Sequence, residues 1–356
     1  MINLFKVRMS PNAGEETTKI LNSGFIGQGP KVEEFEDLLW NELKSETRPV
    51  TMNSCTSAIE MALDLIGIEQ GYEVISTPAS CWASSINILR KKAKIVWADI
   101  DPITFNIDPN SVEKLITDKT KAIIAVNWAG RLCDYKKLKS FGIPVIEDAA
   151  HRGISDISNE EHGDYICYSF QAIKFLTTID GGILIAPNEE KEEEARLKRW
   201  FGLDRKGTGF RCKNDIKLVG TKTHLVDVNA TIGILNIEES KDSVIKHKKN
   251  SKFLIENIKN SNISFPEYDK NCHYWIFSIS ILNKKKDLFM EYMKENGIDC
   301  NPVHFRNDDY TCTKEFKNPN LNGVNVFGEC QVCIPNGWWL SQEDLNYIVE
   351  KVNAFD

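Results

Sequence analysis

The sequence contains no apolar run close to the ~20 residues that a membrane-spanning helix requires. Basic residues are not in excess either, because 44 Lys and Arg stand against 51 Asp and Glu, which gives a formal net charge of −7. Residues 1–6 have neither the basic stretch nor the long apolar stretch of a secretion signal. These absences argue against a membrane protein and against a nucleic-acid-binding protein, which normally presents a strongly basic face. We expect a cytoplasmic protein with no membrane and no nucleic-acid partner.

Signals for a metal site or a dinucleotide site are also missing. Cys330 and Cys333 form a single C-x-x-C, without a second pair or a histidine at metal-ligand spacing. Because no export signal is present, we expect the ten cysteines to be reduced, and buried small residues are favoured over metal or redox chemistry. Gly27 and Gly29 form a G-x-G that follows no strand and has no third glycine, so a turn is predicted there. No metal site is predicted.

The composition is that of an ordinary globular protein, with 42% apolar and 27% charged residues in 356 positions, enough for about two to three domains. Strand-like and helix-like segments alternate in the first half. Strands are predicted at residues 73–77, 94–99, 122–127, 145–148, 165–170 and 182–186, and helices at residues 58–65, 111–115, 135–140 and 189–199. This alternation predicts a mainly parallel α/β sheet covered on both faces, with ligands beyond the carboxyl ends of its strands.

The pattern changes after about residue 236. Further strands are predicted at residues 274–281 and 331–335, and further helices at residues 286–296 and 342–353. We therefore predict a large domain at residues 1–235 and a smaller C-terminal α+β domain at residues 236–356. Residues 1–30 are expected to pack near the smaller domain.

Polar residues at the start of one predicted helix and at the carboxyl end of one predicted strand suit the binding of a charged ligand. Ser54, Cys55 and Thr56 open a helix whose backbone N–H groups suit a phosphate, although serine is also a usual N-cap. An apolar strand ends in Asp148, and His151 follows one turn later, which places a carboxylate and an imidazole at the edge of the sheet. A capping aspartate is the alternative.

Lys174 follows a buried strand directly before a polar turn, which is an unusual place for a lysine. Buried lysines titrate readily enough to serve as Schiff-base amines. Trp82 lies at another strand-to-helix junction, where a lone aromatic residue is usually part of the core. Together these features match what pyridoxal 5′-phosphate needs: a helix start for the phosphate, a carboxylate for the pyridine nitrogen, a lysine for the aldehyde and a flat side chain for the ring.

Several motifs in the same order make the chain similar to the DegT/DnrJ/EryC1/StrS family of sugar aminotransferases, over essentially its whole length. The stretches that carry the resemblance are residues 23–30 (SGFIGQGP), 101–108 (DPITFNID), 146–151 (IEDAAH), 169–174 (SFQAIK) and 180–182 (DGG). The resemblance implies a pyridoxal-phosphate enzyme of fold type I, an aminotransferase, that works as a homodimer with shared active sites. Some family members carry histidine instead of the lysine and are dehydratases, and Lys174 argues against that branch.

Carried over by position, the resemblance also implies roles at the cofactor. Lys174 would bind the cofactor as a Schiff base and move the proton during the reaction. Asp148 would pair with the pyridine nitrogen, His151 would lie near the ring oxygen, and Trp82 would stack on the ring.

For the phosphate, the resemblance implies Ser169 together with the backbone and hydroxyl groups of Cys55 and Thr56. The family commonly has a Gly-Thr pair in the first loop, so Cys55 is tolerable if only its backbone N–H is used. In the family a Gly-x-Asn-x-Arg stretch of the neighbouring subunit also reaches the phosphate. Here the matching stretch is Gly-Thr-Lys-Thr-His, in which Lys222 could replace the asparagine while His224 leaves the role of the arginine open.

The acceptor is the least defined part. Residues 205–222 carry six basic residues and one acid, which suits a phosphorylated acceptor, with a solvated loop as the alternative. Arg205, His304 and Arg306 are the predicted substrate-binding residues. The family implies glutamate as amino donor and a keto group on a phosphorylated or nucleotide-linked sugar as acceptor, in bacterial surface polysaccharide (capsule or O-antigen) biosynthesis. The alternatives are a small keto phosphate such as dihydroxyacetone phosphate, or a non-catalytic regulatory protein on the same fold.

Overall fold

Short apolar runs that end in polar residues build the central sheet. The computed structural model describes residues 1–205 and 215–356, so Lys206, Arg211 and Lys213 of the basic stretch lie outside the described residues. The seven strands lie in the order β1-β7-β6-β5-β4-β2-β3. Their bounds are β1 (Val50–Met52), β2 (Glu73–Ser76), β3 (Lys94–Trp97), β4 (Thr120–Val126), β5 (Val145–Asp148), β6 (Tyr165–Ser169) and β7 (Gly182–Ile185). From β3 to β6 neighbouring strands are parallel, whereas β7 pairs antiparallel with β6 and β1, so the predicted mainly parallel α/β sheet is confirmed.

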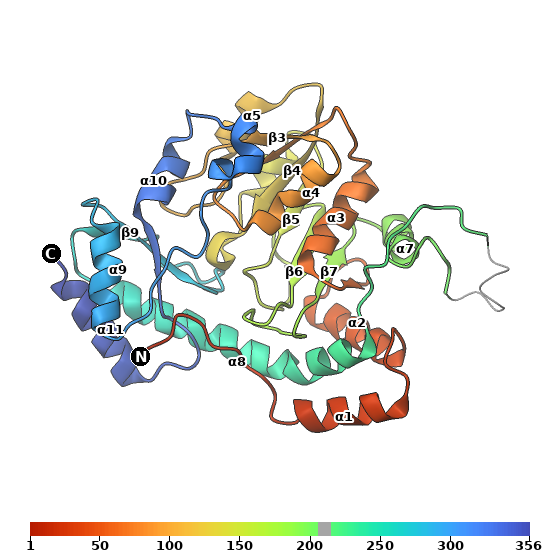
Figure 1. Ribbon diagram of the computed structural model, residues 1–356, viewed down its shortest axis with the longest axis horizontal. Helices are drawn as coiled ribbons and strands as arrows, with labels where there is room; N and C mark the ends of the chain where they lie inside the picture. Colours follow the sequence, from red (N-terminus) through yellow and green to blue (C-terminus); the bar gives the residue numbers. More distant parts are fainter. Residues whose placement is uncertain (206–214) are drawn as a thin grey trace.

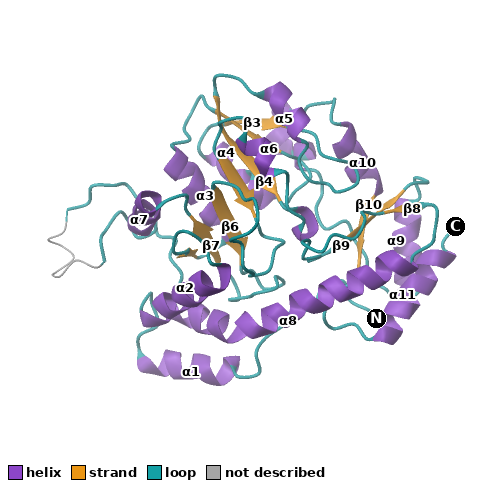
Figure 2. Ribbon diagram, turned by 180° about the vertical axis from the view of Figure 1, so that it is seen from behind, coloured by secondary structure: helices purple, strands orange, loops and turns teal. Residues whose placement is uncertain are grey.

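Helices cover both faces of this sheet, as Figure 2 shows. The helices of the first half are α1 (Ala13–Ser23), α2 (Pro30–Leu43), α3 (Cys55–Ile66), α4 (Ile86–Arg90), α5 (Pro109–Leu115), α6 (Tyr135–Lys139) and α7 (Glu189–Lys198). One face packs on the apolar side of α3, including Ala58, Ile59 and Ala62, whereas α2, α5 and α6 pack on the other face. Because both faces are buried, the strands read as continuous apolar runs.

A second, smaller sheet contains β8 (Ile263–Ser264), β9 (Phe277–Ile281) and β10 (Gln331–Ile334), paired antiparallel in the order β10-β9-β8. The same part of the chain contains the helices α9 (Lys286–Glu295), α10 (Asn322–Cys330) and α11 (Gln342–Ala354). The strand predicted at residues 331–335 corresponds to β10, so within the C-x-x-C only Cys333 lies in a strand, whereas Cys330 ends α10.

The 31-residue helix α8 (Asp227–Asn257) links the two sheets and runs below both of them (Figure 1). The predicted domain boundary at residues 235/236 falls inside this helix, and the division into two domains stays a prediction. The N-terminal residues lie against the C-terminal part, because Ile2 forms a parallel bridge with Ile298. None of the helices in the described ranges is long and apolar enough to cross a membrane.

Candidate active site

Asp148 lies at the carboxyl end of β5, where its carboxylate is buried with 3% of its surface exposed. Ser84 donates to Oδ2 through its Oγ at 2.6 Å, and the Ala150 N–H donates to Oδ1 at 3.0 Å. Burial raises the pKa of Asp148, while these two hydrogen bonds act in the opposite direction. The site therefore holds a carboxylate that can accept a further donor, such as a protonated ring nitrogen.

Lys174 lies in the loop after β6, close enough to Asp148 for the two charges to interact. Its Nζ is 3.3 Å from the centroid of the Trp275 ring, whose Nε1 donates to the Ile173 carbonyl at 3.0 Å. Burial lowers the pKa of Lys174 to about 8. At pH 7 roughly a tenth of such an amine is uncharged, far more than for an ordinary lysine, so Lys174 is suited to attack an aldehyde.

His151 presents one nitrogen to the same space. The backbone N–H of Ala129 donates to its Nδ1 at 3.2 Å, which assigns the proton of the neutral ring to Nε2. The ring packs on Trp275 at 4.3 Å and is stacked with His304 at 5.7 Å between centroids. Burial, reinforced by the Lys174 charge, lowers the pKa of both histidines, that of His304 to about 3. Nε2 of His151 is therefore a donor that suits a ring oxygen.

The first turn of α3 forms an anion cradle beside these residues. Ser54 caps the helix by accepting the Ser57 N–H at its Oγ, and the amides of Cys55 and Thr56 have no acceptor within the helix. A Cβ at Gly182 would lie 2.6 Å from the Cys55 nitrogen, so only glycine lets α3 approach the strands this closely.

The geometry at Cys55 leaves its backbone available to an anion. The Sγ atom lies 3.7 Å from the Cys167 carbonyl oxygen and 4.0 Å from Oδ1 of Asp148, under the helix. Ser169 is paired with Gly182 in the register of β6 and β7, next to this helix start. The residues therefore fit a phosphate bound through amides and hydroxyls, and the roles of Cys55, Thr56 and Ser169 stay predictions.

Trp82 begins the 3-10 turn η1 (Trp82–Ser84) and contacts Tyr310 edge-on at 5.8 Å. Tyr310, His304 and Arg306 line a cavity of about 500 Å³. Because His304 stacks on His151, this cavity adjoins the Lys174 site. The Arg306 guanidinium donates twice to Asp308 at 2.7 Å, so its predicted role in substrate binding stays a prediction.

Lys222 and Arg205 lie elsewhere, on the indole of Trp200, with Nζ and Cζ at 5.4 and 4.7 Å from the ring centroid. Arg205 also donates to the Gln28 carbonyl at 2.9 Å. It lines a different cavity from the one that contains His304 and Arg306, the other two predicted substrate-binding residues. The structure thus does not bring Arg205 or Lys222 together with Lys174 of the same chain. His224 packs on Trp200 at 4.0 Å.

His224 is uncharged at neutral pH, because burial and the nearby Lys222, Arg205 and Arg199 charges lower its pKa to about 4. It therefore cannot supply the positive charge of the family's arginine, and Lys222 is the cation of that stretch.

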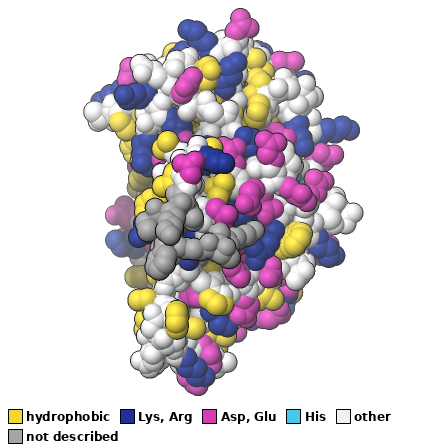
Figure 3. Space-filling model, turned by 90° about the vertical axis from the view of Figure 1, so that its right-hand side faces the viewer, with side chains coloured by type: hydrophobic (Ala, Val, Ile, Leu, Met, Phe, Trp, Pro, Cys, Tyr) yellow, Lys and Arg dark blue, Asp and Glu magenta, His cyan; other side chains and the backbone are white. Residues whose placement is uncertain are grey.

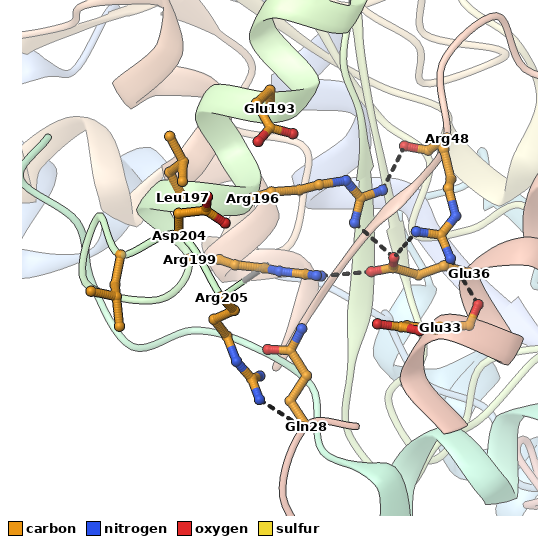
Figure 4. A pocket seen from close by; sticks show the side chains of 11 residues that line it. Gln28, Glu33, Glu36, Arg48, Glu193, Arg196, Leu197, Arg199, Asp204 and Arg205 are labelled. Carbon is orange, nitrogen blue, oxygen red and sulfur yellow. Dashed lines mark hydrogen bonds and ion pairs between the residues drawn. The ribbon is translucent and has the colours of Figure 1, made fainter. Parts of the chain in front are cut away.

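An ion-pair network holds this region in place (Figure 4). Glu36, 1% exposed, accepts from Arg199 at 2.6 Å and from Arg196 at 2.7 Å, and Arg48 lies within 3.0 Å. Although burial alone would raise it, the pKa of Glu36 is lowered to about 2 by these guanidinium groups. The network ties α2 and β1 to the end of α7, directly before Trp200.

Two residues of the site were missed by the sequence analysis. Ser84 stands in an Ala-Ser-Ser run that looks like any polar junction, and Trp275 lies in a run of aromatic residues. Nothing local to either residue distinguishes it, because each contacts a residue far away in the chain. In the described ranges, no three His, Cys, Asp or Glu side chains gather in a way that could hold a metal ion.

Comparison with known proteins agrees with this geometry. The DegT/DnrJ/EryC1/StrS aminotransferase family matches residues 8–353. The spore coat polysaccharide biosynthesis protein SpsC of Bacillus subtilis is 32% identical over 64% of this chain and 61% of its own length. Among solved structures, AtS13 from Actinomadura melliaura is 32% identical with a TM-score of 0.93, over 100% of this chain and 99% of its own. The sugar aminotransferase CalS13 from Micromonospora echinospora is 27% identical with a TM-score of 0.92, over 99% and 100%.

Proposed function

Because the chain belongs to the DegT/DnrJ/EryC1/StrS aminotransferase family, we propose that it moves an amino group from glutamate to the keto group of a phosphorylated or nucleotide-linked sugar. The protein is a pyridoxal-phosphate-dependent aminotransferase of fold type I. Its product would enter the biosynthesis of a surface polysaccharide such as a capsule or O-antigen. The observation that carries the proposal is the buried Lys174 amine, with its lowered pKa, beside the Asp148 carboxylate.

The residues around this pair have separate tasks. Pyridoxal 5′-phosphate, when bound, supplies the electron sink for the transfer of the amino group. Lys174 would hold the aldehyde end through its Nζ and, once released from it, would take up and return the proton at the same atom. Asp148 would keep a proton on the ring nitrogen, and Nε2–H of His151 would donate to the ring oxygen. Trp82 would pack against the ring and limit the access of water.

The phosphate group would be bound by the start of α3. The amides of Cys55 and Thr56 point out of the first turn, where the helix dipole favours an anion. The hydroxyl of Ser169 at the end of β6 would add a further donor.

The acceptor would occupy the cavity that begins at His304 and Tyr310. Its volume of about 500 Å³ is enough for a sugar. Its wall carries the cations Lys286 and Arg306 and also the acids Asp309 and Glu329, so the sugar assignment rests on the size of the cavity and on the family rather than on the charge of the wall. The relatives support the same class, because SpsC is named for spore coat polysaccharide biosynthesis and CalS13 is a sugar aminotransferase.

We also propose a homodimer in which each protomer completes the site of its partner. Lys222 lies over the Trp200 ring of its own chain, and the shared-site arrangement of the family would bring it to the cofactor phosphate of a second copy. Apolar side chains are exposed in the same region, with Val219 at 95% and Phe201 at 45%. Figure 3 shows hydrophobic side chains between charged ones on the side that carries α7. Such residues suit a surface that a second copy covers.

The acceptor is tested by incubating the loaded enzyme with glutamate and a panel of keto compounds while 2-oxoglutarate is measured. The panel contains nucleotide-linked keto sugars, sugar phosphates and dihydroxyacetone phosphate. We expect 2-oxoglutarate with a keto sugar and no product from dihydroxyacetone phosphate. Activity with dihydroxyacetone phosphate alone would overturn the sugar assignment, and activity with another amino donor but not glutamate would overturn the donor.

A further inference from the structure

Ser84 makes a buried contact with Asp148 that none of the proposed roles uses. Its side chain is 0% exposed, and its Oγ donates to Oδ2 of Asp148 at 2.6 Å. The other oxygen, Oδ1, accepts from the Ala150 N–H at 3.0 Å. Each carboxylate oxygen has two lone pairs, so these two donors fix the plane of the carboxylate and still leave positions for a third donor.

The backbone around Ser84 explains why the hydroxyl has this position. Ser84 ends the turn η1, in which its N–H donates to the Cys81 carbonyl at 3.1 Å and the Ser85 N–H donates to the Trp82 carbonyl at 3.0 Å. The turn is thus closed by backbone bonds that a substitution at Ser84 does not remove. One turn presents both the indole of Trp82 and the hydroxyl that holds Asp148.

The electrostatic effect of Ser84 on Asp148 has a definite sign. Burial raises the pKa of Asp148, and the Ser84 hydrogen bond is the largest of the effects that lower it. An ionised carboxylate is the form that can keep a proton on a ring nitrogen. Loss of the hydroxyl would therefore favour the protonated carboxyl, which is the wrong form for that task.

We propose that Ser84 is a positioning residue that fixes the Asp148 carboxylate, ionised and correctly oriented, for the ring nitrogen of the cofactor. The inference rests on the proposed role of Asp148 and adds the group that prepares it. Ser84 acts through Asp148 and does not itself touch the reacting atoms.

The first test uses the protein without cofactor. Thermal unfolding is followed between about pH 3, below the ordinary pKa of an aspartate, and about pH 8 for the wild type, Ser84→Ala and the matched control Ser85→Ala. Ser85 is equally buried, and its hydroxyl contacts the neutral hydroxyl of Ser76 at 3.2 Å.

The sign of the expected result follows from Asp148. Removing the Ser84 donor raises the pKa of Asp148 further, and the folded protein is penalised only where Asp148 is ionised. The loss of Tm in Ser84→Ala should therefore grow as the pH rises, whereas the loss in Ser85→Ala should be the same at every pH. A pH-independent loss in Ser84→Ala would make Ser84 merely structural and overturn the proposal.

The second test measures the affinity for pyridoxal 5′-phosphate and the pH dependence of its absorption in the bound state. The Ser84 hydrogen bond is present with and without the cofactor, so only the part that depends on the pairing of Asp148 with the ring nitrogen changes the affinity, and Ser84→Ala should weaken binding by up to about tenfold. In Ser84→Ala, the pH at which the absorption of the bound cofactor changes should also shift. Ser84→Thr keeps the hydroxyl and should restore both, and Ser85→Ala should change neither.

Asp148→Asn separates the two levels of the argument. If this variant turns over like the wild type, the proposed role of Asp148 itself fails. If Asp148→Asn is inactive while Ser84→Ala binds and titrates the cofactor like Ser85→Ala, only the inference about Ser84 is overturned.

Discussion

The rate at which Lys174 reacts with the cofactor should depend on pH, and the midpoint of that dependence should be low because burial lowers the pKa of Lys174. The uncharged amine is the attacking form, and a pKa of about 8 predicts that the capture rate rises between about pH 7 and pH 9. Over that interval the uncharged fraction increases roughly tenfold, whereas for an ordinary lysine the rise would come more than two units higher. The assay is rapid mixing of the cofactor-free protein with pyridoxal 5′-phosphate, followed by absorbance at a series of pH values.

The charge of Asp148 gives this prediction a second, independent arm. Asp148 is one of the groups that raise the pKa of Lys174 against the effect of burial. Asp148→Asn removes that charge, so the midpoint of the capture rate should move to lower pH. A wild-type midpoint near that of an exposed lysine, or a midpoint that moves upward in Asp148→Asn, would refute the reasoning from burial.

Three further predictions concern the phosphate cradle, the shared site and the fold. Gly182→Ala should lower the free energy of unfolding by about 1–3 kcal/mol and weaken cofactor binding, because its Cβ would meet the Cys55 nitrogen at 2.6 Å; Gly14→Ala, with nothing within 4 Å, is the control, and equal effects in both would contradict the cradle. Mixed Lys174→Ala and Lys222→Met protomers, each inactive alone, should regain activity, and an absence of rescue after verified subunit exchange would contradict the shared site. Glu36→Gln should cost roughly 3–5 kcal/mol at neutral pH in urea unfolding. Because the pKa of Glu36 is lowered to about 2, this cost should shrink only as the pH falls from about 4 towards 2, and a cost already lost at pH 6 would contradict the network.

The sheet and the centre of the site were predictable because their signals are local. Strands buried on both faces read as apolar runs, and Asp148 and Lys174 stand out because one ends such a run and the other lies in the loop that follows one. β1, with three residues, is too short to give a pattern. The bounds of the strand predicted at residues 145–148 are confirmed, whereas those of the other predicted strands were wrong by one to three residues at one or both ends.

Helix α8 was missed for a different physical reason. Its buried side includes Ser240, Ser243, His247 and Asn250, so the apolar periodicity that marks a helix is weak there. Two of these polar groups are satisfied by long-range contacts, because His247 pairs with the Tyr274 carbonyl at 3.0 Å and the Asn250 amide donates to the Asn336 carbonyl at 3.1 Å. Contacts of this kind depend on the fold and leave no trace in a local pattern.

The contact between Ser84 and Asp148 was unpredictable in the same way. The two residues are 64 positions apart, and the serine is chemically identical to many others in the chain. Only the closure of η1 over the end of β5 gives it a partner.

The central claim, that Lys174 is the amine that holds the cofactor, is tested most directly by reduction with borohydride. The protein is loaded with pyridoxal 5′-phosphate, reduced and digested, and the modified peptide is identified by mass spectrometry. We predict that the cofactor mass is found on Lys174 in the wild type and on no peptide in Lys174→Ala. Modification of a different lysine, or an unmodified Lys174 in a protein that is saturated with cofactor, would contradict the account.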